Sequence, residues 1–132
     1  MSRLTQRLNG LATVVDHLSI RFEYDALGRI TYSPSDGGTP RFVLGRAQEG
    51  VIWRFCAHLP TELVQGVARL AAREKGIPIA LENTRPPERW VMIERKFIAA
   101  TGESEGAPGK IDVRHELVSY KNVPIGEIYS IF

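Results

Sequence analysis

The stretch from Arg41 to Phe55, RFVLGRAQEGVIWRF, decides the fold class. Its two apolar runs, at 41–44 and 51–55, are rich in β-branched and aromatic residues, and the segment 45–50, bounded by Gly45 and Gly50, separates them. Short apolar runs on either side of such a segment are typical of neighbouring antiparallel strands. The stretch therefore predicts two strands of an antiparallel sheet.

The residues before this stretch predict a first hairpin. Phe22 and Tyr24 alternate with charged residues, and Ile30 and Tyr32 resume the alternation after the turn residues 25–28. Together with the stretch above, these segments predict an antiparallel meander of about four strands.

The C-terminal part of the chain adds further strands. Residues 111–113, 117–120 and 125–132 are rich in β-branched and aromatic residues, and residues 121–124 predict a turn between the last two segments. An apolar terminal strand needs a partner, either inside this sheet or on another chain. A homodimer through residues 125–132 is therefore one alternative.

Three segments have helical periodicity. Apolar residues recur every three or four positions from residue 3 to 20, although Asn9-Gly10 interrupts the pattern, and the clearest helix runs from Pro60 to a stop at Gly76 and Pro78. Residues 87–101 predict a third helix, with a buried strand at 90–93 as the alternative. We expect one α+β domain spanning 1–132, with an N-terminal helix and two further helices packed on a mainly antiparallel sheet of about six strands.

Composition excludes several classes of protein. Hydrophobic residues make up 43% and charged residues 24% of the chain, as in ordinary globular domains, and the net charge is only +2. Basic and acidic residues are mixed along the chain, so we expect no nucleic-acid partner. Because Cys56 is the single cysteine, and no signal peptide or membrane-spanning run is present, we expect a cytoplasmic protein without membrane contact.

No motif in the sequence supplies a complete catalytic or metal site. Segment 104–110 ends like a phosphate-binding loop but has Ser104 in place of the first glycine and is followed by Ile111 in place of Ser or Thr. His115 points away from Asp112 and Glu116 on a strand, so we expect no metal ion there.

Cys56 and His58 are two residues apart and would share one face of a strand. A nearby base is what activates a catalytic thiol, but Cys56 ends an apolar run, and a buried structural cysteine is the favoured interpretation.

Arginine and aromatic residues accompany the central stretch and are the best ligand-binding candidates. They are Arg41, Arg46, Trp53, Arg54 and His58. If the arginines converge, they form an anion site for a carboxylate or a phosphate. If they point outward, they only make the sheet soluble.

The stretch from Asp16 to Pro60 resembles the region that precedes the catalytic domain in some bacterial N-acetyltransferases of the GNAT family. The matching residues are 16–18, 24–25, 28–29, 40–42, 44–46, 49–50, 53–55 and 59–60. In that family the acetyl-CoA pyrophosphate binds backbone amides of a Gln/Arg-x-x-Gly-x-Gly/Ala segment between a strand and a helix. Nothing in this sequence matches that segment, so the resemblance implies an accessory region without a cofactor.

Three interpretations of function follow. The first is an accessory or recognition domain related to acetyltransferases, which binds a small anionic ligand or a partner chain and is not catalytic alone. The second is a small enzyme or ligand-binding protein that uses the arginine and aromatic residues, and the third is an interaction module that dimerises through the terminal strand.

Overall fold

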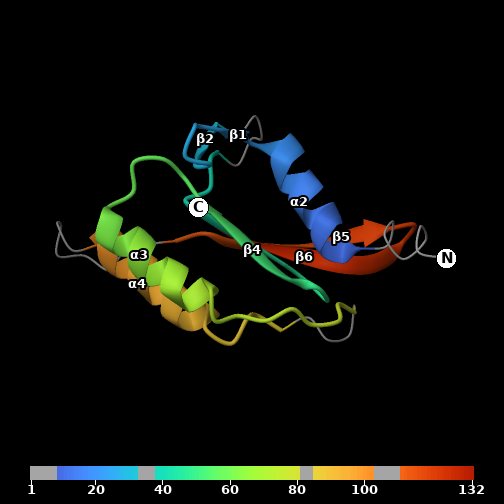
Figure 1. Cartoon of the computed structure of the whole chain (residues 1–132). Coiled ribbons are helices and arrows are strands. Elements are labelled where there is room, and N and C mark those ends of the chain that lie inside the picture. Colours follow the sequence, from blue (N-terminus) through green and yellow to red (C-terminus); the bar gives the residue numbers. More distant parts are fainter. Residues whose placement is uncertain (1–8, 33–37, 81–84, 103–110) are drawn as a thin grey trace.

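The structure is a computed structural model that describes residues 9–32, 38–80, 85–102 and 111–132. In these ranges the chain forms three helices and six strands, which confirms the predicted α+β class (Figure 1). In chain order the elements are α2 (Gly10–Arg21), β1 (Glu23–Tyr24), β2 (Ile30–Tyr32), β3 (Phe42–Ala47), β4 (Gly50–Phe55), α3 (Thr61–Ala71), α4 (Trp90–Gly102), β5 (Val113–Tyr120) and β6 (Val123–Ile131).

The main sheet has four antiparallel strands in the order β4-β3-β6-β5. Every residue of β3 is buried, because helices cover both faces of the sheet at this strand. A strand that is buried on both faces reads as a continuous apolar run, as residues 42–45 of β3 do, and Arg46 is the one charged residue in this strand. The connection to β4 is shorter than predicted: Ala47 pairs with Gly50, so only Gln48 and Glu49 form the turn.

The terminal strand is satisfied inside this sheet. β6 pairs with β3 along one edge and with β5 along the other, so its backbone is bonded on both sides. Of the two alternatives for residues 125–132, pairing within the sheet is the one that forms, so this strand does not need a second chain as a partner. Lys121 and Asn122 form the tight β5–β6 turn, and both have positive φ angles, of 49° and 64°.

Helices α3 and α4 cover one face of the sheet with an aromatic core. The ring of Phe42 lies 6.0 Å from that of Trp90 and 5.8 Å from that of Phe97, and the rings of Trp90 and Tyr129 are 5.3 Å apart. Residues 90–93 belong to α4, so the strand alternative for this segment is wrong. Trp90, Ile93 and Phe97 face the sheet because they repeat with helical periodicity.

Helix α2 covers the opposite face and approaches it closely. Asn9 caps the helix, because its side chain accepts a hydrogen bond from Ala12 N at 2.9 Å. Val14 lies over two glycines of the sheet: a Cβ atom added at Gly45 or Gly126 would lie 2.3 or 2.4 Å from its methyl groups. The predicted helical stripe before Asn9 lies outside the described residues.

The first hairpin is separate from the main sheet. β1 and β2 form a two-stranded sheet of their own, and among the described residues one isolated bridge, between Ile30 and Cys56, joins it to the end of β4. The predicted meander of four strands is therefore divided between two sheets. The hairpin itself is confirmed, with Gly28 in its turn at φ 76°.

Candidate functional site

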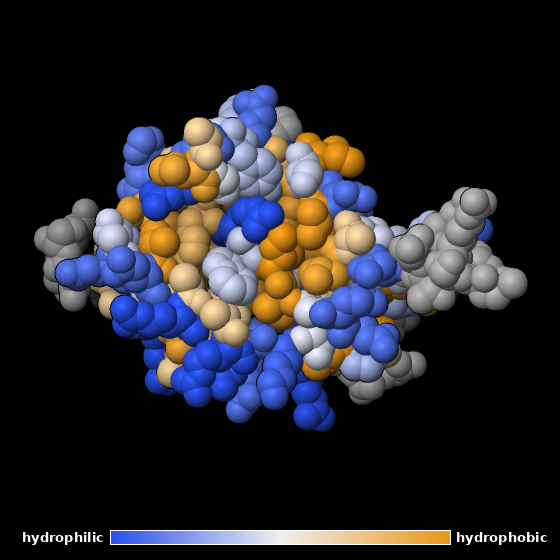
Figure 2. Space-filling view, in the orientation of Figure 1, coloured by the Kyte–Doolittle hydropathy of each residue, from blue (hydrophilic) through white to orange (hydrophobic). Residues whose placement is uncertain are grey.

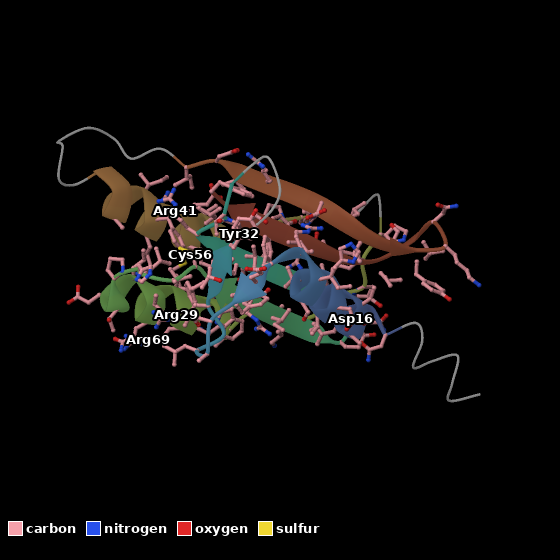
Figure 3. All side chains as sticks on the ribbon, turned by 90° about the horizontal axis from the view of Figure 1, so that it is seen from above. Asp16, Arg29, Tyr32, Arg41, Cys56 and Arg69 are labelled. Carbon is pink, nitrogen blue, oxygen red and sulfur yellow. The ribbon has the colours of Figure 1, made fainter. Side chains whose placement is uncertain are left out.

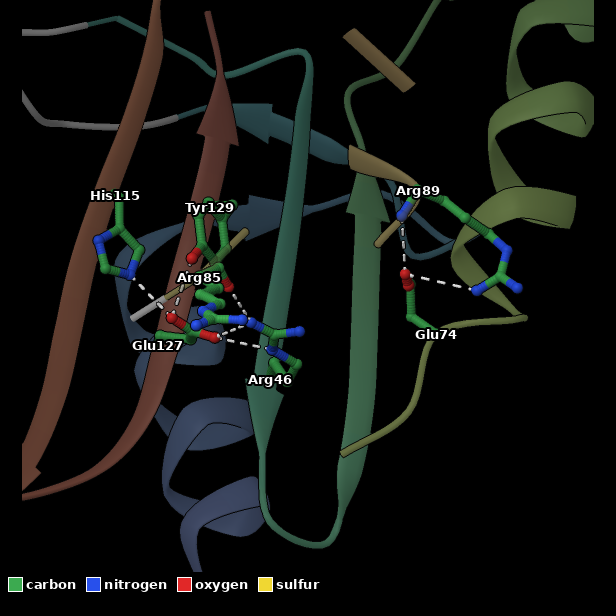
Figure 4. A network of polar contacts seen from close by, with 7 residues as sticks. All are labelled: Arg46, Glu74, Arg85, Arg89, His115, Glu127 and Tyr129. Atoms are coloured by element: carbon green, nitrogen blue, oxygen red, sulfur yellow. Dashed lines mark hydrogen bonds and ion pairs between the residues drawn. The ribbon is translucent and has the colours of Figure 1, made fainter. Parts of the chain in front are cut away.

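A buried ion pair joins the two central strands of the main sheet. Arg46 on β3 and Glu127 on β6 are directly opposite in the register, with Arg46 Nε 2.7 Å and Nη2 2.6 Å from Glu127 Oε2 (Figure 4). The side chains are only 6% and 1% exposed. Removing a carboxylate from water costs several kcal/mol unless an opposite charge compensates it. The buried carboxylate of Glu127 therefore depends on the charge of Arg46, and the guanidinium of Arg46 depends on Glu127.

Two further donors complete the bonding of Glu127. His115 Nε2 lies 2.9 Å and the Tyr129 hydroxyl 3.1 Å from the other carboxylate oxygen, Oε1. Because an ionised carboxylate only accepts, both groups donate to it, which leaves Nδ1 of a neutral His115 as an acceptor. Burial and the neighbouring negative charge of Glu127 raise the pKa of Tyr129 above its ordinary value, so the phenol stays protonated.

The chain between α3 and α4 covers Arg46. Nη2 of Arg46 also donates to the carbonyl oxygen of Arg85 in this covering chain, so the guanidinium is held by the covering chain as well as by Glu127. A second pair stands beside it, in which Glu74 accepts a hydrogen bond from Arg89 N at 3.0 Å and faces Arg89 Nη1 at 3.6 Å. The guanidinium of Arg89 also donates to the carbonyl oxygen of Arg73 at 3.1 Å, so it ties the end of α3 to the start of α4.

Gly76 lets this covering chain approach the sheet. A Cβ atom added at Gly76 would lie 2.4 Å from Gly50 N and 2.5 Å from both Ala47 O and Gln48 O. The amide of Ile77 then donates to Ala47 O at 3.1 Å. Glycine is therefore needed here for close contact with the β3–β4 turn, whereas α3 already ends at Ala71, earlier than the predicted stop at Gly76.

These contacts enclose a cleft of about 340 Å³ between the end of α3, the start of α4 and the sheet. It is lined by Arg46, Arg73, Glu74, Lys75, Ile77, Glu88 and Arg89. In Figure 2, hydrophilic residues gather along the lower edge of the face, where α3 ends and the next segment begins. Four cations and two carboxylates line the cleft, so its lining is net positive.

The structure does not bring the predicted arginines together. Arg46 faces the side of the sheet that α3 and α4 cover, with Leu44 and Phe42, while Arg54 lies on the other face, opposite Val43, and donates to Trp53 O at 2.9 Å. Arg41 stands before β3, where its Nη2 donates to Phe132 O at 2.7 Å. An anion site in which all three arginines converge is therefore not formed.

The other two predicted ligand-binding residues are Trp53, which packs against the core, and His58, which lies in a turn. Trp53 packs against the aromatic core beneath α3 and α4. His58 stands in the turn after β4 with a φ angle of 68°, a conformation that few residues other than glycine adopt.

Cys56 lies at the end of β4, at the same end of the sheet as Arg41 (Figure 3). Burial raises the pKa of its thiol above the ordinary value, although the nearby charge of Arg41 opposes the shift. A thiol with a raised pKa is a poor nucleophile, which agrees with a structural role.

Glu127 and Tyr129 were missed by the sequence analysis. The sequence signal for Glu127 is that it is the single charged residue of an apolar strand, 123–131, just as Arg46 is the single charged residue of 42–47. Without the register there is no way to know that the two charges are opposite each other. His115 was considered only with Asp112 and Glu116, which point away from it as expected: Glu116 pairs with Arg21 on the α2 side.

Within the ranges that the structure describes, no group of three or more His, Cys, Asp or Glu side chains is placed to hold a metal ion. In the same ranges, each helix is too short or too polar to cross a bilayer. Comparison with known proteins gives no match to a family model, to a curated protein or to a solved structure.

Proposed function

We propose that this chain is a recognition domain that binds a small anionic ligand without transforming it, and that it is related to the region preceding the catalytic domain of GNAT-family acetyltransferases. The relationship rests on the residues of 16–60 that resemble that region. The recognition role rests on the chemistry of the described polar groups.

The observation that carries this proposal is that the buried polar groups are occupied by one another. Glu127 accepts bonds from Arg46, His115 and Tyr129, and Glu74 is paired with Arg89. Every fully buried polar side-chain atom among the described residues has a hydrogen-bond partner. A catalytic nucleophile or base needs an activated, available atom, whereas these groups hold the shape of a cleft.

The cations at the rim of that cleft support recognition of an anion. Arg73 and Lys75 are exposed and have no ion pair with any described residue. Cations at the rim of a cleft attract and orient anionic ligands, because the low dielectric constant of the surrounding protein strengthens the electric field of the cations.

A thermal-shift panel tests the proposal. The panel contains phosphorylated metabolites, dicarboxylates and acetyl-CoA, and each ligand is recovered afterwards and identified by NMR. We expect at least one small anion to raise the Tm and to be recovered unchanged, because a ligand that binds only the folded state stabilises it by mass action. We expect no shift with acetyl-CoA. A panel without any shift would contradict the recognition role, and a clear shift with acetyl-CoA would contradict the absence of a cofactor site.

A second candidate function is acid–base catalysis at His115. The observation in its favour is the contact with Glu127, because a carboxylate that holds one imidazole nitrogen leaves the other one correctly oriented to accept a proton. The side chain of His115 is 31% exposed, so part of it is open to solvent. Conversion of any ligand of the panel, lost in a His115→Ala variant, would establish this function in place of pure recognition.

A further inference from the structure

We infer that the cleft between α3 and α4 is a binding site for a small molecule that carries a phosphate group, with Arg46 at its floor and Arg73 and Lys75 at its rim. This inference rests on the proposed recognition function and specifies its site and ligand class.

The guanidinium of Arg46 forms the floor of the cleft, and one of its nitrogens has no partner among the described residues. Arg46 uses Nε and Nη2 for Glu127 and for the carbonyl oxygen of Arg85. Nη1 has no hydrogen-bond partner among the described residues, and it is not among the fully buried atoms. Since Arg46 lines the cleft, Nη1 is the donor that we assign to a ligand in the cleft.

The charge of Arg46 is largely balanced by Glu127, so attraction of an anion depends on the rim. Two of the lining cations, Arg46 and Arg89, are held by carboxylates, which leaves Arg73 and Lys75 for the ligand. The one other lining carboxylate, Glu88, has a side chain that is 86% exposed and lies 3.9 Å from Arg89, so water weakens its repulsion.

The arrangement of donors suits a phosphate group. A phosphomonoester carries between one and two negative charges at neutral pH and three terminal oxygens, which matches one N–H donor at the floor of the cleft and two exposed cations at its rim. The negative end of α3 opposes an anion here, but its last carbonyls are already bonded, with Arg73 O accepting from Arg89 and Leu70 O from Arg73 N. A volume of about 340 Å³ is at the small end of ligand sites, which favours a metabolite over a nucleotide.

Isothermal titration calorimetry with pyrophosphate as the probe tests this inference, with succinate as the comparison anion. We expect pyrophosphate to bind more tightly than succinate. We expect the Arg73→Ala/Lys75→Ala double variant to weaken pyrophosphate binding roughly ten-fold or more, because it removes two charge-assisted contacts. We expect Glu88→Gln to tighten binding, since it removes an exposed negative charge that lines the cleft and repels an anion.

The matched control is the Arg69→Ala/Arg95→Ala double variant, which removes the same net charge from exposed positions on α3 and α4 outside the cleft. We expect it to bind pyrophosphate like the unmodified chain. Equal weakening by both double variants would show unspecific charge attraction and overturn the site, while the recognition function would stand on any other ligand of the panel. Tighter binding of succinate would overturn the phosphate class alone, and no binding of any anion would overturn both proposals.

Discussion

Arg46 and Glu127 are cross-strand partners at the centre of the main sheet, and their side chains point to the face that α3 and α4 cover. Their position has two consequences. The pair fixes the register of β3 against β6, because a slip of β3 by one residue would turn Arg46 to the face covered by α2 and separate it from Glu127. It also holds a guanidinium at the floor of the cleft in one orientation.

The first prediction is that Glu127→Gln destabilises the fold strongly. The substitution keeps the size of the side chain but leaves the charge of Arg46 buried without a counter-charge. The expected loss is about 3–5 kcal/mol in the free energy of unfolding, measured by urea denaturation. The paired variant Arg46→Met/Glu127→Leu is expected to lose much less, because it removes both charges together.

The exposed pair of Arg21 and Glu116 provides the control for this prediction. Its side chains are 29% and 44% exposed, so Glu116→Gln is expected to cost at most about 1 kcal/mol. Equal losses for Glu116→Gln and Glu127→Gln would show that burial of the Arg46–Glu127 pair has no special role.

The second prediction concerns two glycines with opposite surroundings. Gly126→Ala is expected to destabilise the chain by about 1–3 kcal/mol, because the added Cβ would lie 2.4 Å from a methyl group of Val14. Gly66→Ala in α3 is expected to stabilise it by about 0.5–1 kcal/mol, because alanine favours the helix and the new Cβ meets only the flexible side chain of Lys96, at 3.3 Å. Thermal denaturation gives both values, and a loss at Gly66 as large as that at Gly126 would contradict the difference described between the surroundings of the two glycines.

The third prediction is a loss of stability at alkaline pH. The pKa values of Tyr129 and Tyr24 are raised above 10.0, and that of Cys56 above 9.0, in each case first of all by burial. From about pH 9 upward the unfolded chain releases these protons while the folded chain keeps them, so the free energy of unfolding falls as pH rises. Urea denaturation between roughly pH 9 and pH 11 measures the slope. Tyr129→Phe is expected to flatten it, and an unchanged slope in this variant would rule out Tyr129 as a contributor.

The fourth prediction is that Cys56 reacts slowly with thiol reagents in the folded chain. Since its pKa is raised by burial, little thiolate is present at pH 8. Labelling with a chromogenic disulfide reagent is expected to be about ten-fold slower, or more, in buffer than in concentrated urea. Similar rates in the two solvents would revive the interpretation of Cys56 as a reactive thiol.

Local patterns predicted most of the fold because they follow from short-range chemistry. The spacing of apolar residues placed α3, and turn residues placed the β1–β2 hairpin. Residues 90–93 were ambiguous because a short apolar run has the same appearance in a buried strand and in a buried helix. The order of the strands was beyond such patterns, because β3 pairs with β6, about eighty residues later, only through the tertiary fold.

The candidate site was predicted only in part for the same reason. Arg46 was singled out as an arginine within an apolar strand, but its partners Glu127 and His115 come from strands near the other end of the chain. Arg73 and Lys75 looked like ordinary cations at the end of a helix, and only the crossing of Gly76 over the β3–β4 turn brings them to the cleft. A polar site built from four segments is visible only when the strand order is known.

NMR mapping of a pyrophosphate titration shows whether the cleft above Arg46 binds a phosphate group. We expect the chemical-shift changes to concentrate in the side-chain resonances of Arg46 and in the backbone amides of residues 73–77 and 88–89. Changes that are absent, that spread evenly over exposed lysines and arginines, or that centre on Arg41 or Arg54 would contradict it.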